Sequence, residues 1–233
     1  MSFQLLRFRW PELRHCGSYM AYGSVLILSS AALGADRSSE DSWSLRTMGI
    51  WSEPEKNELR ILTNGDELDL GFDSEFGYSA AIGWQPKGFA FGFELEYQST
   101  EHELVSGTLS ELGSISADAT RSVDTIFLNA VARQKLGLDV TIFGGAGLGY
   151  SSIEFDLRSL GGDTDFDVGT FTDETISFQV FVGFEKAISD NLGFVTQVGW
   201  FQTDQPRFEN ELTQPFTMDV KAPSLSVGLR YEF

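Results

Sequence analysis

The chain has few basic residues, one cysteine and two histidines, and each shortage excludes a class of protein. Its 233 residues hold 16 Lys and Arg against 34 Asp and Glu, for a formal net charge of −18. Nucleic acid is excluded as a partner, because its phosphates repel so acidic a chain. Cys16 permits no disulfide within the chain, and the preceding Leu13-Arg14-His15 are not the small residues of a lipoprotein box. Two histidines also restrict acid–base catalysis.

Long apolar runs are missing from the body of the chain. Mean hydropathy is −0.10, and no stretch there reaches the roughly 18 apolar residues of a membrane helix. The 42% hydrophobic content is enough for the core of one domain. A helical membrane protein is therefore disfavoured.

The first 35 residues have the pattern of a targeting segment. A leader with three arginines precedes an apolar stretch over 18–33, which ends in the small-residue run of 31–35. We predict a signal peptide over 1–35 and a mature domain over 36–233. A buried helix or a short membrane anchor is the alternative. Removal of the signal peptide takes away three arginines and one glutamate, so the mature domain is more acidic still.

From about residue 43 onward, apolar residues recur at every second position, which is typical of β-strands. The clearest run places Phe89, Phe91, Phe93, Leu95 and Tyr97 on one face. Similar runs cover 76–84, 126–132, 140–150, 176–184, 194–200 and 225–233. A weaker strand covers 43–53, and its pattern does not assign the faces. The sequence therefore predicts eight strands.

Short and long connections alternate between these strands. Turn-forming residues mark short connections at 86–88, 135–137 and 188–191. Longer connections cover 54–73, 101–120, 156–173 and 205–220. This alternation is typical of an up-and-down barrel with all short turns at one end. We predict an all-β fold, an antiparallel up-and-down transmembrane β-barrel of about eight strands, each about ten residues long.

The two faces of the strands differ in size and charge. An eight-stranded barrel has room inside only for modest side chains, so the face rich in aromatic residues should contact lipid. The opposite face carries small residues and six charges that we predict to form an interior network: Glu94, Glu96, Arg133, Glu185, Arg230 and Glu232. For Arg230 and Glu232, a solvated place near a strand end is an equal alternative. Six aromatics are predicted to lie at the membrane interfaces, Trp51, Trp84, Tyr97, Tyr150, Trp200 and Tyr231.

Three segments resemble known proteins: TIFGGAGLGYSS, ISFQVFVGFEKAISDNLGFVTQVGWF, and the last strand over 225–233, which ends on Phe233. Together they resemble small outer-membrane β-barrel proteins of the OmpA, OmpX and opacity-protein type. The resemblance implies an outer-membrane location, contact with outer-membrane lipid and lipopolysaccharide, and recognition of Tyr231 and Phe233 by the barrel-assembly machinery. That group has no catalytic residues in common.

Two loop segments are candidates for chemistry. His102, the one histidine of the mature domain, is expected in a solvated loop, but it is also a candidate general base beside Ser99 or Ser106. Five residues have the spacing of a calcium loop, Asp163, Asp165, Asp167, Gly169 and Glu174. However, Val168 occupies the position where such a loop needs glycine, and no helix is expected on either side. A solvated acidic loop fits better, and we assign no catalytic, cofactor or metal residue.

The four long connections together hold 18 acidic and 4 basic residues, so one end of the barrel should carry a negative field. This field either repels anionic surfaces or binds lipopolysaccharide phosphates through divalent cations. The leading hypothesis is a non-enzymatic surface barrel with a structural, protective or adhesive role, whose loops contact a host or cell-surface ligand. The alternatives are a narrow pore, a lipid-modifying enzyme and a soluble lipocalin-like carrier.

Overall fold

The computed structural model describes residues 40–54, 57–61, 67–109, 113–115, 117–137, 139–160, 169–208 and 215–233. The predicted signal peptide lies outside these ranges. No helix in the described ranges is long and apolar enough to cross a membrane.

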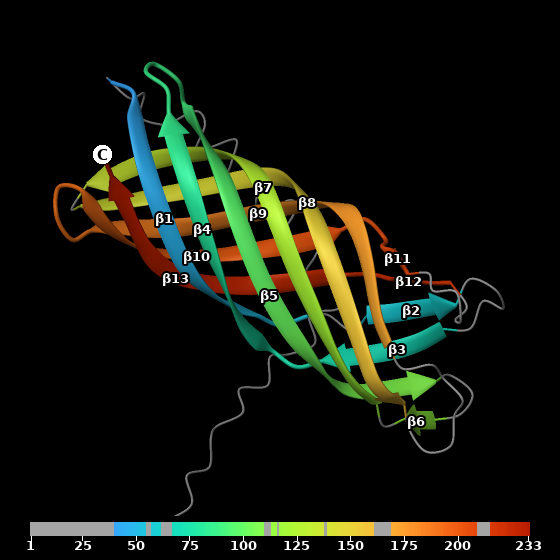
Figure 1. The fold of residues 1–233 in the computed structure, drawn as a ribbon. Coiled ribbons are helices and arrows are strands. Elements are labelled where there is room, and N and C mark those ends of the chain that lie inside the picture. The colour runs from blue at the N-terminus through green and yellow to red at the C-terminus, as the bar shows by residue number, and fades with distance from the viewer. Residues whose placement is uncertain are drawn as a thin grey trace, which may run out of the picture.

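Eight antiparallel strands form a closed barrel (Figure 1). They are β1 (Ser42–Ser52), β4 (Glu75–Gln85), β5 (Phe91–Leu109), β7 (Ala117–Gly137), β8 (Val140–Leu160), β9 (Gly169–Ala187), β10 (Leu192–Thr203) and β13 (Lys221–Glu232). Each pairs with the next along the chain, and β1 closes the barrel on β13 from Ser44 opposite Glu232 to Ser52 opposite Ser224. The predicted eight-stranded up-and-down barrel is confirmed.

Four of these strands are about twice as long as predicted. β5, β7, β8 and β9 have 19 to 21 residues and continue into segments expected to be loops. Five short strands lie at the same end: β2 (Asn57–Ile61), β3 (Glu67–Phe72), β6 (Gly113–Ile115), β11 (Arg207–Phe208) and β12 (Phe216–Met218). β3 pairs with β5, and β2 joins β3 to β12. The described residues of the four long connections therefore lie largely in strands, and we call this end of the barrel the outer end.

The short turns lie at the opposite end, next to the C-terminus (Figure 1). Those after β4 and β9 lie where the sequence predicts them. The turn after β7 lies two residues later than expected, because β7 continues through Gly137. Gly137 and Asp139 take positive φ angles of 84° and 60° there, as a tight hairpin requires.

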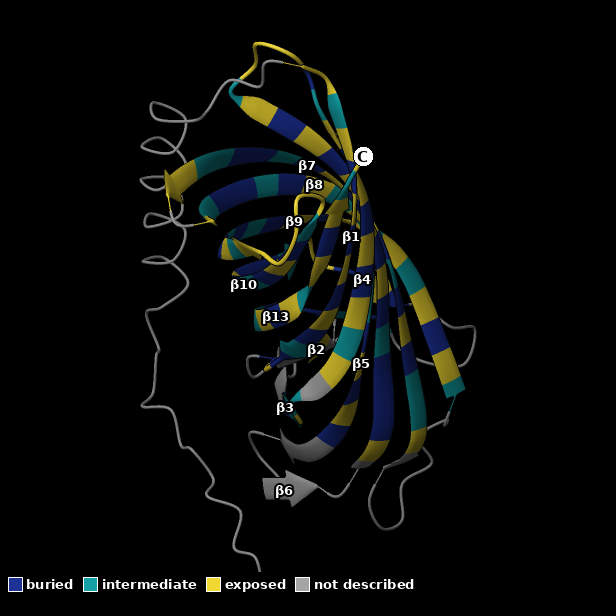
Figure 2. Cartoon of the chain, turned by 90° about the vertical axis from the view of Figure 1, so that its left-hand side faces the viewer, coloured by how far each residue is buried: buried dark blue, intermediate teal, exposed yellow. Residues whose placement is uncertain are grey.

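Exposed and buried residues alternate along the strands (Figure 2). The exposed apolar side chains form a band around the barrel, with Leu95 at 53%, Leu128 at 61% and Leu148 at 70% exposed. Such a band suits a hydrocarbon environment. The soluble-carrier alternative, which needs an inward apolar face and a polar exterior at this level, is wrong.

Tyrosines mark the outer edge of the band. The Tyr97 hydroxyl donates to Asp124 at 2.7 Å, and the Tyr150 hydroxyl donates to Glu174 at 2.6 Å. Beyond them the outward residues are acidic and exposed, for example Glu101 on β5. The membrane-spanning segments therefore end at this ring, and the strand portions beyond it lie outside the membrane.

Four of the six predicted interface aromatics are exposed: Trp84, Tyr97, Tyr150 and Tyr231. Trp51 is half-buried. Trp200 departs from the prediction, because it is only 8% exposed. Its neighbours in register are Val180 and Pro223, near the outer end of β10.

Candidate functional site: the barrel interior

An ion-pair network fills the lower part of the barrel, toward the short turns. Arg46 on β1 lies between two carboxylates, with Nη2 at 2.7 Å from Glu94 and 3.4 Å from Glu96. Its Nη1 donates to Gln197 at 2.8 Å. Arg133 contacts the other Glu94 oxygen at 2.8 Å. Charges of opposite sign thus alternate across the lumen, as buried charges require.

Amide side chains complete the network near the barrel's middle. Glu96 accepts hydrogen bonds from Asn129 at 2.8 Å and from Gln179 at 3.0 Å. A chain of hydroxyls, Thr125, Ser151 and Ser177, lies beyond them, with spacings of 2.7 and 2.9 Å. The polar atoms of these side chains are thus satisfied by hydrogen bonds to one another.

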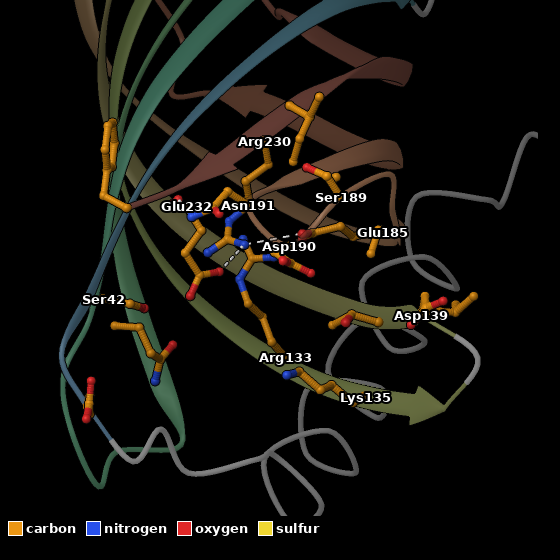
Figure 3. A pocket seen from close by; sticks show the side chains of 18 of the residues that line it. Ser42, Arg133, Lys135, Asp139, Glu185, Ser189, Asp190, Asn191, Arg230 and Glu232 are labelled. Atoms are coloured by element: carbon orange, nitrogen blue, oxygen red, sulfur yellow. Dashed lines mark hydrogen bonds and ion pairs between the residues drawn. The ribbon is translucent and has the colours of Figure 1, made fainter.

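A basin opens at the short-turn end, with a volume of about 860 Å³ (Figure 3). Arg133 and Arg230 point into it and share Glu185, which lies 2.9 Å from Arg133 and 3.2 Å from Arg230. Arg230 also contacts Glu232 at 2.8 Å. These ion pairs close the inner end of the basin.

All six charges predicted to form an interior network belong to it. Arg230 is buried, with 9% of its side chain exposed, whereas Glu232 is at 43% and lies at the basin's rim. Arg46 was missed, because the sequence pattern did not assign the faces of its strand.

The outer part of the interior is apolar. Phe216 on β12 contacts three rings from three other strands: Phe155 at 6.3 Å, Phe171 at 5.4 Å and Phe208 at 5.0 Å between ring centroids. The same cluster contains residues of β3, β5, β7 and β10. The residues of β11 and β12 therefore pack over the barrel's outer end, where solvated loops were expected.

Glycines make room for aromatic rings inside the barrel. A Cβ on Gly149 would lie 2.6 Å from the Phe127 ring. A Cβ on Gly183 would meet the Phe143 ring and the main-chain oxygen of Thr196. Phe127 and Phe143 are 0% and 2% exposed, so the narrow interior holds large rings because glycines face them.

His102 lies inside the barrel, contrary to the prediction of a solvated loop. It is 2% exposed, because β5 continues beyond the membrane and residue 102 faces inward. Its Nε2 lies 3.3 Å from the Ser52 hydroxyl. The predicted partner Ser99 follows Tyr97 by two residues and so lies on the outward side of the strand. The other predicted partner, Ser106, belongs to β5, but its side chain lies outside the described residues.

Burial and, to a lesser degree, the positive charge of Arg121 lower the pKa of His102 to about 4. The imidazole is therefore neutral at pH 7. A general base that must accept a proton is disfavoured in this place.

Most of the calcium-like segment lies outside the described residues. Of its five members, Gly169 begins β9 and Glu174 is exposed and accepts the Tyr150 hydrogen bond. Within the described ranges, no three His, Cys, Asp or Glu side chains form a group that could hold a metal ion.

A closed eight-stranded barrel with an apolar outer band and a polar lower interior defines a class of protein. The chain is a small integral β-barrel of the outer-membrane type, which confirms the predicted fold class and location.

Comparison with solved structures agrees with this class. OprG from Pseudomonas aeruginosa matches with a TM-score of 0.58 and 14% identity, over 84% of this chain and 97% of that one. A major outer membrane protein from Thermus thermophilus matches at 0.53 and 13%, over 82% and 99%. The outer membrane protease OmpT from Escherichia coli matches at 0.50 and 10%, over 87% and 100%. These likenesses show the fold alone. No family model and no curated protein sequence matches the chain.

Proposed function

We propose that this protein is a non-catalytic barrel that anchors an acidic outer wall at the cell surface, where it contacts cationic or cation-bridged partners. The observation that carries the proposal is the filled interior. Ion pairs occupy its lower part and aromatic rings its outer part, which leaves the outward surface as the place of contact.

The filled lumen argues against a pore. The Arg46, Glu94 and Arg133 side chains meet at 2.7 to 2.8 Å, and Phe216 packs among rings beyond them. In planar lipid bilayers we expect the purified barrel to give no unitary conductance steps, like the same protein inactivated by boiling. Reproducible steps in the folded protein alone would contradict the proposal.

The surroundings of His102 argue against hydrolysis or acyl transfer. Ser52 and His102 form a hydroxyl–imidazole pair, but Arg121 replaces the carboxylate that normally stabilises the imidazolium. We expect host cells that express the wild type, His102→Ala or Ser52→Ala to have the same lipid composition. A lipid product that appears with the wild type and disappears with both variants would establish an enzyme.

The outward side chains beyond the tyrosine ring support an acidic contact surface. Exposed carboxylates there include Glu101, Glu103, Asp118, Asp124 and Glu154. Like-charged surfaces repel unless divalent cations bridge them. The same chemistry suits the phosphates of lipopolysaccharide.

Vesicle binding tests this surface. Zwitterionic proteoliposomes that carry the barrel should capture phosphatidylglycerol vesicles with Ca²⁺ and lose them with EDTA. A variant with Glu101, Glu103 and Glu154 changed to Gln should capture fewer. Equal capture by this variant and the wild type would remove the acidic wall as the contact surface.

The last strand supports recognition by the barrel-assembly machinery. Tyr231 and Phe233 are 44% and 72% exposed, and their rings lie 5.1 Å apart. We expect Phe233→Ser to lower the amount of folded barrel in outer membranes, with Leu136→Ser, at an exposed position near the end of β7, as the control. Equal amounts of both variants would contradict this role.

A further inference from the structure

Arg121 is a buried cation without an anionic partner. Its residue is 0% exposed, and Nε, Nη1 and Nη2 each lack a hydrogen-bond acceptor in the described part of the chain. The Phe72 ring covers the guanidinium, with 4.2 Å between Cζ and the ring centroid. Arg46 and Arg133, by contrast, each contact two carboxylates.

Such isolation is energetically costly. A buried charge loses its hydration, and only an opposite charge or a full set of hydrogen bonds compensates that loss. A face-on aromatic ring offsets only a small part of it. Burial lowers the pKa of Arg121 to about 9, so the guanidinium keeps its proton at pH 7.

A small cavity lies beside Arg121, with a volume of about 10 Å³ for the centre of a water-sized particle. Five other polar residues line it: Ser52, Gln98, Thr100, His102 and Ser224. They come from β1, β5 and β13, so the cavity lies inside the barrel between facing walls. Hydroxyl, amide and imidazole groups supply N–H and O–H donors.

Size and charge together define what this cavity accepts. A volume of about 10 Å³ is the space of roughly one water-sized particle, which excludes carboxylates on carbon chains, phosphates and sulfate. A monatomic anion is slightly larger than water, so it enters if the flexible side chains that line the cavity move outward a little. Water satisfies N–H groups but leaves the guanidinium charge uncompensated. We propose that the cavity beside Arg121 binds a single halide-sized anion, chloride under ordinary conditions, held by the guanidinium and the surrounding hydroxyl and amide donors.

This site is independent of the contact surface proposed above, since it is enclosed by the barrel wall. Its anion joins residues of β1, β5, β7 and β13 across the lumen, just below the apolar cluster that contains Phe201 and Val220. The anion therefore acts as a structural ion for the outer half of the barrel.

Bromide diffraction tests occupancy in the unmodified protein. Crystals grown in sodium bromide should give an anomalous peak within hydrogen-bonding distance of the Arg121 guanidinium. Crystals grown in sodium gluconate should give none there. The proposal fails if the bromide crystals show no anomalous peak in this cavity.

Unfolding measurements test the energetic linkage. The folded barrel alone should bind the anion, so the unfolding equilibrium constant should fall by up to about tenfold for a tenfold rise in chloride above its dissociation constant. Gluconate at equal ionic strength is the reference salt. Arg121→Met should abolish the difference between the two salts, whereas the matched control Arg158→Met, on the exposed part of β8, should keep it.

Arg121→Lys keeps the positive charge and should keep part of the chloride response if Arg121→Met does not fold. An equal chloride effect in the wild type and Arg121→Met, or no effect in the wild type, would overturn the site.

Discussion

Arg46 and Arg121 both lie on the inner wall of the barrel, and their surroundings give them opposite energetics. Arg46 is compensated by Glu94 and Glu96, so its charge holds the wall together. Arg121 has the Phe72 ring and His102 as neighbours. Since both arginines are buried, the position of the nearest carboxylate decides whether each stabilises the fold.

Removal of Arg46 should destabilise the barrel strongly. Arg46→Gln leaves Glu94 and Glu96 buried with less compensation, at an expected cost of about 3–5 kcal/mol. Arg158→Gln, the control, removes a half-exposed pair with Asp156 and should cost at most about 1 kcal/mol. Urea unfolding in detergent micelles, followed by the tryptophan fluorescence, measures both. Similar costs for the two variants would mean that the lower network contributes little stability.

His102 should make folding stability depend on pH in a defined window. Its pKa falls from about 6.5 to about 4 on folding, so the unfolded chain binds more protons between these values. Stability from this residue is complete above pH 6.5 and is lost as the pH falls toward 4. NMR titration of the imidazole in residues 36–233, where His102 is the one histidine, should show no protonation at pH 5.5. A midpoint near 6.5 would place the ring in water.

Along β8, apolar residues change face where the strand leaves the membrane. Ile142, Leu148 and Tyr150 lie on the outward side, whereas Ile153 and Phe155 are 0% and 3% exposed and face inward. The environment explains the change: lipid surrounds the lower part of the strand, and water surrounds the upper part. The change of parity after Tyr150 is the sequence feature that identifies the outer apolar core.

The close packing of β7 against β8 depends on glycine. Gly149→Ala places a methyl group 2.6 Å from the Phe127 ring and 2.9 Å from the Ile126 oxygen, and the backbone atom cannot move easily. We expect a loss of about 1–3 kcal/mol. At the control position, Gly169→Ala, nothing lies within 4 Å of the added atom. Chemical unfolding of both variants measures the difference, and an unaffected Gly149→Ala would show that the Phe127 ring can move away.

The whole molecule has an apolar belt below an acidic outer wall, and the two respond differently to charge. Leu95→Arg introduces a cation into the belt one outward position below Tyr97 and should cost about 1–3 kcal/mol, between the midplane and interface values. Glu101→Arg, further along β5 on the same outward side, faces water and should be nearly neutral. Unfolding from lipid vesicles measures each cost. A neutral Leu95→Arg would place the membrane elsewhere on the barrel.

Much of the architecture follows from the sequence because it depends on local period. Apolar residues at every second position predict the strands, their outward faces and the even strand number. The residues between them face inward, and these include the six charges of the lower network that the sequence predicted. The turn predicted at 135–137 is displaced because strand pairing continues through Lys135 to Gly137 with an irregular register.

Contacts between distant segments follow from the tertiary structure alone. Arg46 meets Glu94 across 48 residues, and His102 meets Ser52 across 50, so no local pattern predicts either pair. The sequence by itself determined a membrane barrel with a charged lumen, since side-chain period and polarity are properties of each strand. Only the closed barrel decided which buried charges are paired, how far the strands extend beyond the membrane, and that aromatic side chains fill the outer end, because these depend on register across the whole sheet.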